Sequence, residues 1–171
     1  MSKIKKLCTV SMLIAVSVVL GAYLTVRIGG GIKITFKFIT VFMSAYLFGP
    51  LVGGAVGLIS DVIAFLLSPT ASFLPQISAI EFVYGFIFGV MFHKKNMSIS
   101  KIVICAAVQM MIINLFGTSY VLKGFFGDKY LTAVITRLPT AILNTVIQIA
   151  SLSVLSKNSV LRKAADKIGQ L

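Results

Sequence analysis

The chain has 171 residues, of which 58% are hydrophobic and only 12% are charged, and its formal net charge is +12. A soluble domain is about half apolar and a quarter charged, so this composition excludes a soluble enzyme, a disordered tail and a disulfide scaffold. The 16 Lys and Arg residues punctuate long apolar runs, whereas a nucleic-acid binder needs a solvated basic face. The composition therefore predicts an integral membrane protein.

Six hydrophobic segments with short breaks between them fill most of the chain. A helix needs about 20 apolar residues to cross a bilayer. Six segments approach that length, at residues 7–26, 34–49, 51–67, 73–92, 99–119 and 131–155. We therefore predict an all-α membrane protein, with one compact six-helix bundle over 1–156. The basic tail over 157–171 is either a helix lying on the inner leaflet or a frayed end that enforces topology.

The basic residues orient this bundle, because cytoplasmic loops carry an excess of Lys and Arg. With the N-terminus inside, ten of the 16 cations fall on the cytoplasmic side, and we expect both termini there. The six outer cations are Arg27, Lys33, Lys37, Lys123, Lys129 and Arg137. One interpretation is an outward-facing site for an anionic small molecule, which they would bind by charge-assisted hydrogen bonds. The alternative is that long basic side chains reach lipid headgroups; their clustering favours the site.

Two acids, Asp61 and Glu81, lie inside the third and fourth predicted spans. A charge at mid-helix costs about 2.5–3.5 kcal/mol on insertion scales, so it normally faces the bundle interior and has a partner. Three roles are open: accepting hydrogen bonds from a ligand with several N–H donors, relaying protons, or forming an internal ion pair with Lys37 or Arg137.

Polar residues share one face of the sixth predicted span. Arg137, Ala141, Asn144 and Gln148 follow one another at spacings of four, three and four, and Asn114 on the fifth span could face them. Such a face lines either a binding site or a hydrogen-bonded seam between helices.

Small residues recur at intervals of four and predict close helix packing. The positions are Ala45, Gly49, Gly53, Gly57, Gly85 and Gly89. Ser11 and Ala15 have the same spacing on the first span and could serve a partner subunit.

Enzymatic and metal-binding signatures are missing from the sequence. It has no G-x-x-x-x-G-K-[ST] loop for ATP, no Ser/His/acid constellation, and one histidine, His93, with no cysteine or acid nearby in sequence. We expect no catalysis, no metal and no cofactor in this chain.

The chain resembles the substrate-binding S components of energy-coupling-factor (ECF) vitamin transporters, most closely the folate family. The resemblance runs from about Lys5 to Leu155. It is carried by the Phe48-Gly49-Pro50-Leu51-Val52-Gly53-Gly54 turn with Asp61 following, by Ile32-Lys33-Ile34-Thr35-Phe36, by Phe73-Leu74-Pro75, and by Tyr84-Gly85-Phe86-Ile87-Phe88-Gly89. Departures include Gln76-Ile77-Ser78 where folate-family members commonly have Gly-Phe-Thr, and the absence of tryptophan.

The resemblance implies high-affinity capture of folate from outside the cell by a multi-pass protein of the bacterial plasma membrane. A T subunit, which would dock at Ser11 and Ala15, and two ATPases that bind ATP and Mg²⁺ would drive release inside. Folate carboxylates would meet Lys33, Lys37 or Arg137, with Arg27 nearby. Its pterin donors would meet Asp61 or Glu81, and Phe73 or Tyr120 would stack on the ring.

Three alternatives remain open at the level of sequence. The vitamin could be another one, such as pantothenate or a queuosine precursor. The chain could be a stand-alone transporter with Asp61 or Glu81 as proton carriers, or a structural membrane subunit without a ligand.

Overall fold

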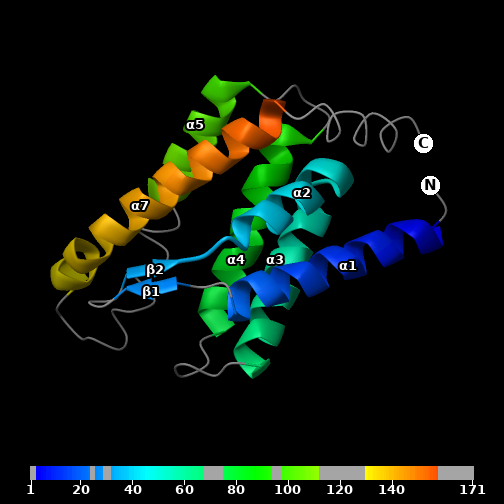
Figure 1. The fold of residues 1–171 in the computed structure, drawn as a ribbon, viewed down its shortest axis with the longest axis horizontal. Helices are drawn as coiled ribbons and strands as arrows, with labels where there is room; N and C mark the ends of the chain where they lie inside the picture. The colour runs from blue at the N-terminus through cyan, green and yellow to red at the C-terminus, as the bar shows by residue number, and fades with distance from the viewer. Residues whose placement is uncertain are drawn as a thin grey trace.

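The computed structural model describes residues 3–23, 26–28, 32–67, 75–93, 98–111 and 130–157. In these ranges the chain forms six helices and one short hairpin (Figure 1). The elements are α1 (Lys3–Ala22), β1 (Val26–Ile28), β2 (Ile32–Ile34), α2 (Phe38–Phe48), α3 (Pro50–Leu67), α4 (Pro75–Phe92), α5 (Ile99–Gln109) and α7 (Tyr130–Lys157). The predicted all-α bundle is confirmed, and the antiparallel hairpin β1–β2 is an addition that the sequence did not indicate.

Four of the described helices are long and apolar enough to cross a membrane: α1, α3, α4 and the second part of α7 from Pro139. The helices α2 and α5 have 11 residues each within the described ranges, which is about 16 Å and half of the hydrocarbon core. We predicted a second span over 34–49, but its helix begins only at Phe38. Ile32–Ile34 pairs instead with Val26–Ile28 as a strand.

Contacts at the α2–α3 turn define one end of the bundle. Gly49 has φ 96°, a value that side chains with a Cβ rarely adopt, and it allows α3 to start at once with Pro50. The ring Nδ1 of His93, just after α4, lies 3.2 Å from the Tyr46 carbonyl oxygen. Lys6 in α1 lies over the Phe48 ring, 5.7 Å from its centroid.

The hairpin lies at the opposite end of the bundle, beside the first turns of α7 (Figure 1). From there α7 runs back toward the end that holds the start of α1. The beginning of α1 and the end of α7 therefore lie on the same side, as two cytoplasmic termini would require; which side faces the cytoplasm stays a prediction.

Backbones of α3 and α4 touch where glycines face each other. A Cβ placed on Gly85 would clash with the Gly53 carbonyl oxygen, and one placed on Gly57 would lie 2.6 Å from the Glu81 carbonyl oxygen. Gly89 meets Pro50 in the same way. The predicted role of the small residues in helix packing is therefore confirmed for these two helices.

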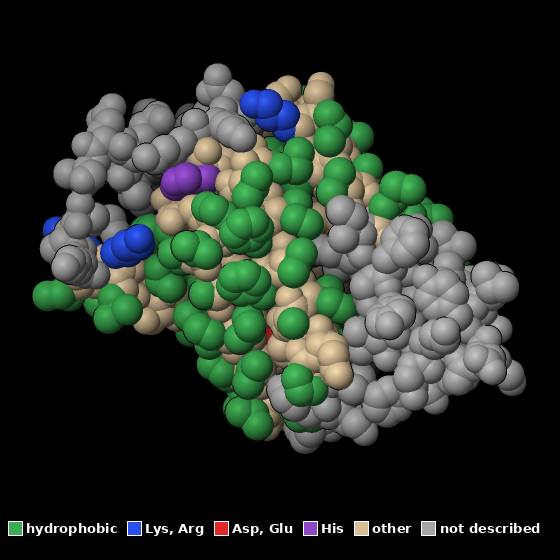
Figure 2. Space-filling model, turned by 180° about the vertical axis from the view of Figure 1, so that it is seen from behind, with side chains coloured by type: hydrophobic (Ala, Val, Ile, Leu, Met, Phe, Trp, Pro, Cys, Tyr) green, Lys and Arg blue, Asp and Glu red, His purple; other side chains and the backbone are tan. Residues whose placement is uncertain are grey.

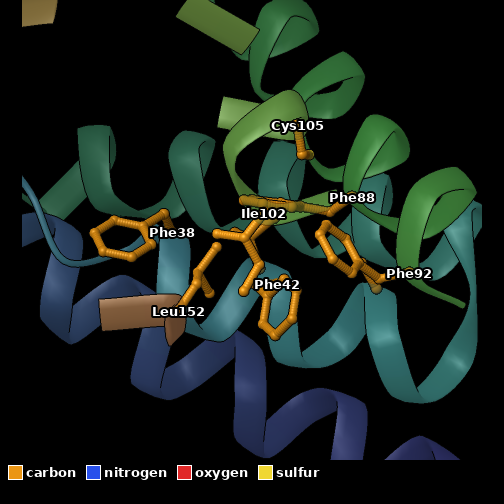
Figure 3. Close-up of a cluster of buried hydrophobic side chains, with 9 residues drawn as sticks. Phe38, Phe42, Phe88, Phe92, Ile102, Cys105 and Leu152 are labelled. Carbon is orange, nitrogen blue, oxygen red and sulfur yellow. The ribbon is translucent and has the colours of Figure 1, made fainter. Parts of the chain in front are cut away.

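An aromatic and aliphatic cluster joins the four helices α2, α4, α5 and α7 (Figure 3). The Phe42 ring meets the rings of Phe88 and Phe92 edge to face, with centroids 5.3 and 5.4 Å apart, a favoured aromatic geometry. Ile102 of α5 and Leu152 of α7 are fully buried against them. This cluster holds α5 and α7 to the rest of the bundle.

Large hydrophobic side chains are exposed along the helices, among them Leu7, Met12, Leu66, Ile104 and Val154. Figure 2 shows one face on which hydrophobic side chains dominate and basic ones lie toward the margins. An apolar surface of this extent suits contact with lipid tails.

The α3–α4 contact can be tested by placing one methyl group in it. We expect Gly85→Ala to lower the free energy of unfolding by about 1–3 kcal/mol, as overpacking does, because its Cβ meets the backbone of Gly53. The measurement is an unfolding titration in detergent micelles. Val83→Ala on the exposed side of the same helix is the control, and equal midpoints for both variants would contradict the close packing.

Candidate binding site

Lys37, Asp61 and Glu81 lie at about the same distance from one end of the bundle, because each is separated from that end by the same number of helical residues. Lys37 precedes Gly49 by 12 residues and Asp61 follows it by 12; Glu81 precedes His93 by 12. The His93 ring packs against Gly49, so all three counts start from the same end. Since a helix rises 1.5 Å per residue, each charge lies about 18 Å from that end.

The Lys37 ammonium binds both carboxylates. Its Nζ lies 3.3 Å from Asp61 Oδ1 and 3.1 Å from Glu81 Oε2. The Lys37 side chain is 7% exposed, whereas those of Asp61 and Glu81 are 28% and 32% exposed. The cation is therefore inside, and the two acids reach from it toward the surface.

The surroundings of Lys37 hold it in place. Its alkyl stem runs beside Gly21 of α1, where a Cβ would lie 3.6 Å from Lys37 Cδ. Its carbonyl oxygen accepts hydrogen bonds from Thr40 Oγ1 and from the amide of Val41. Four helices thus meet at this one side chain, counting the partners on α3 and α4.

With both acids ionised, the cluster would carry one positive and two negative charges, a net charge of −1. A buried ion pair is stable only when its geometry compensates for lost hydration; the third charge has no matching cation among the described residues. A ligand that brings hydrogen-bond donors or positive charge would complement it. The ion pair that the sequence left open for Asp61 and Glu81 is present with Lys37.

The other predicted ligand contacts are described only in part. Arg27 and Lys33 are direct partners across β1 and β2, and Arg137 lies in the first part of α7; their backbones alone are described. Asn144 donates from Nδ2 to the Thr140 carbonyl oxygen of its own helix. Three further predicted residues, Phe73, Asn114 and Tyr120, lie outside the described residues.

A second polar cluster, which the sequence analysis identified only through Gln148, joins α4, α5 and α7. Tyr84 Oη donates to Gln148 Oε1 at 2.9 Å, Gln148 Nε2 donates to Gln109 Oε1 at 2.6 Å, and Gln109 Nε2 donates to the Tyr84 carbonyl oxygen at 3.2 Å. Gln109 is 1% exposed. As a polar residue in an apolar segment, Gln109 could have been identified from the sequence. For this face of α7 the sequence left open a binding site or a hydrogen-bonded seam between helices, and at Gln148 the structure shows the seam.

Ser11 and Ala15 are exposed on α1. Within the described ranges no group of three His, Cys, Asp or Glu side chains is placed to hold a metal ion.

Comparisons with known proteins agree on one family. The family model for the ECF transporter substrate-specific component matches residues 5–156. A folate transporter FolT from Clostridium novyi (strain NT) is 29% identical over 138 residues, which cover 81% of this chain and 80% of that protein.

Two solved structures are similar in fold. A crystal structure of FolT bound with folic acid has a TM-score of 0.80 at 26% identity, over 89% of this chain and 92% of the other. The S component of a bacterial ECF transporter has a TM-score of 0.57 at 18% identity, over 91% of this chain and 97% of the other; that likeness concerns the fold alone.

Removing the Lys37 ammonium would leave two partly buried carboxylates facing each other without the cation that they share. We expect Lys37→Met to lower the free energy of unfolding by about 3–5 kcal/mol, as breaking one side of a buried ion pair does. The triple variant Lys37→Met, Asp61→Asn, Glu81→Gln removes all three charges and should recover most of that loss. Unfolding titrations in one detergent compare them, and a triple variant no more stable than the single one would refute the ion cluster.

Proposed function

This chain belongs to the substrate-specific components of ECF transporters, and from that premise we propose that it captures folate from outside a bacterial cell. The choice of folate as the vitamin rests on the likeness, over 89% of the chain, to the structure of FolT bound with folic acid. The FolT relative from Clostridium novyi supports it independently.

The charges of the site suit the two ends of a folate. Its pterin offers adjacent N–H donors, which complement the carboxylates of Glu81 and Asp61 around Lys37. Its glutamate end carries two carboxylates, which we assign to Arg27, Lys33 and Arg137 because charge-assisted hydrogen bonds to carboxylates are strong. Lys37 is shared by two acids, so its contribution to ligand binding is mainly indirect.

The remaining assignments complete this proposal. Phe73 or Tyr120 stacks on the pterin, and Asn114 and Asn144 line the site. We propose that the protein lies in the bacterial plasma membrane with both termini in the cytoplasm, and that residues 157–171 form its basic cytoplasmic tail.

Transport would need partners, since we propose no catalysis by this chain. A T subunit would dock on the exposed side of α1 at Ser11 and Ala15, where small residues let a helix approach closely. Two ATPase subunits would bind ATP and Mg²⁺ and supply the energy for release inside the cell.

Calorimetric titration of the detergent-purified protein tests the ligand. We expect one-to-one binding of folic acid or 5-formyltetrahydrofolate, and no heat from pantothenate or riboflavin. Binding of another vitamin instead would retain the family and refute folate. ATP-dependent uptake that requires co-expressed T and ATPase subunits and survives collapse of the proton gradient would support the importer over a proton-coupled transporter; the opposite pattern would contradict it.

Two substitutions test the assigned ends of the ligand. We expect Glu81→Gln and Arg137→Ala each to weaken folic acid binding by about tenfold or more, because a hydrogen bond to a charged group contributes about 1.5–3 kcal/mol. Membrane expression should be unchanged. Lys101→Ala in the first turn of α5, at the far end from the hairpin, is the control. Parental affinity in both test variants would refute the assignment.

A further inference from the structure

The two carboxylates around Lys37 are held unequally. Asp61 Oδ1 lies 3.3 Å from the Lys37 ammonium, and its second oxygen, Oδ2, accepts a hydrogen bond of 2.8 Å from Ser78 Oγ. Glu81 contacts the ammonium through Oε2, and its Oε1 has no hydrogen bond or ion pair with any residue that the structure describes. Asp61 is therefore fixed at both oxygens and Glu81 at one.

Exposure alone does not separate these acids, because their side chains are 28% and 32% exposed. Hydrogen bonding does separate them, since Glu81 Oε1, unlike either oxygen of Asp61, has no partner among the described residues and can accept from a ligand that reaches the cluster. Ser78, which makes the difference, is itself 4% exposed. Its hydroxyl is buried behind the carboxylates and is poorly placed to contact a ligand directly.

The close approach of α3 and α4 explains how so short a side chain reaches Asp61. Ser78 and Glu81 are three residues apart on α4 and so lie on the same face of that helix. On α3, Gly57 precedes Asp61 by one turn and lies against the Glu81 backbone, where a Cβ would be 2.6 Å from the carbonyl oxygen. The glycine contact therefore brings the Asp61 carboxylate within reach of the Ser78 hydroxyl.

We propose that Ser78 is a positioning residue for ligand binding, which holds Asp61 and Lys37 so that Glu81 Oε1 is the acceptor for the paired N–H donors of a heterocycle. The inference rests on the proposed function, because it assigns the donor-bearing end of the ligand to Glu81. Without the hydroxyl, Asp61 is free to turn both oxygens toward Lys37. The ammonium then moves away from Glu81, whose carboxylate loses its orientation.

Calorimetric titration with folic acid tests this role in a set of serine variants. We expect Ser78→Ala to raise the Kd about tenfold. Ser78→Thr, which retains a hydroxyl, should bind as the parent does. Ser78→Cys is a second removal variant that preserves volume, and its weak S–H donor should also raise the Kd. The matched control is Ser60→Ala on α3, because the buried Ser60 hydroxyl bonds only its own helix, at the Gly57 carbonyl oxygen.

A double-mutant cycle separates positioning from a general structural effect. If Ser78 acts through Glu81, Ser78→Ala should add no further loss of affinity in a Glu81→Gln background. Losses that multiply in the double variant would overturn the inference, as would parental affinity in both Ser78→Ala and Ser78→Cys. If the unmodified protein itself gives no heat with folic acid, the proposed function is overturned and this inference with it. If the unmodified protein binds and only the serine variants depart from the expected pattern, the inference alone fails.

Discussion

The Lys37 ammonium between Asp61 and Glu81 is the interaction on which the arrangement of the helices depends. A charge inside the bundle is costly unless it is paired, so the start of α2, the second half of α3 and the first half of α4 must meet at one point. The stem of Lys37 also lies against Gly21 of α1. One side chain therefore joins four helices, and its two carboxylate partners are acceptors that a donor-rich ligand would complement.

Glycines and aromatic rings make that meeting point possible. Gly53 and Gly85 let the α3 and α4 backbones touch, which places Asp61 next to Ser78 and Glu81. The rings of Phe42 and Phe88 pack against each other and against side chains of α5 and α7, and so hold these two helices to the bundle. Small residues thus bring α3 and α4 together, whereas large residues hold α5 and α7 to the bundle. The polar site lies beside the close contact of α3 and α4.

The sequence singled out the three charged residues Lys37, Asp61 and Glu81 but did not decide how they pair. Asp61 and Glu81 stood out because acids are rare inside apolar segments, and an ion pair with Lys37 was one of three open roles. The equal separations of Lys37 and Asp61 from Gly49 could have selected that role, since both helices start from the same turn. Ser78 carried no such signal, because a serine in a helix is common and its partner lies on another element. Gln109 differed from its apolar neighbours in the sequence, but its partners Tyr84 and Gln148 lie on other helices.

The sequence by itself determined the membrane class, the six hydrophobic segments and the close packing of the glycine helices, because these follow from composition and from spacing along one helix. The family was indicated by the resemblance of its motifs, such as the Phe48–Gly54 turn, to those of a known family. Only the tertiary structure decided that α2 begins at Phe38, that residues 26–28 and 32–34 pair as strands, and that one cation is shared by two acids. Each of these depends on contacts between segments far apart in the chain. Hydrogen-bond direction and the burial of charge, which separate Asp61 from Glu81, exist only once the helices are packed.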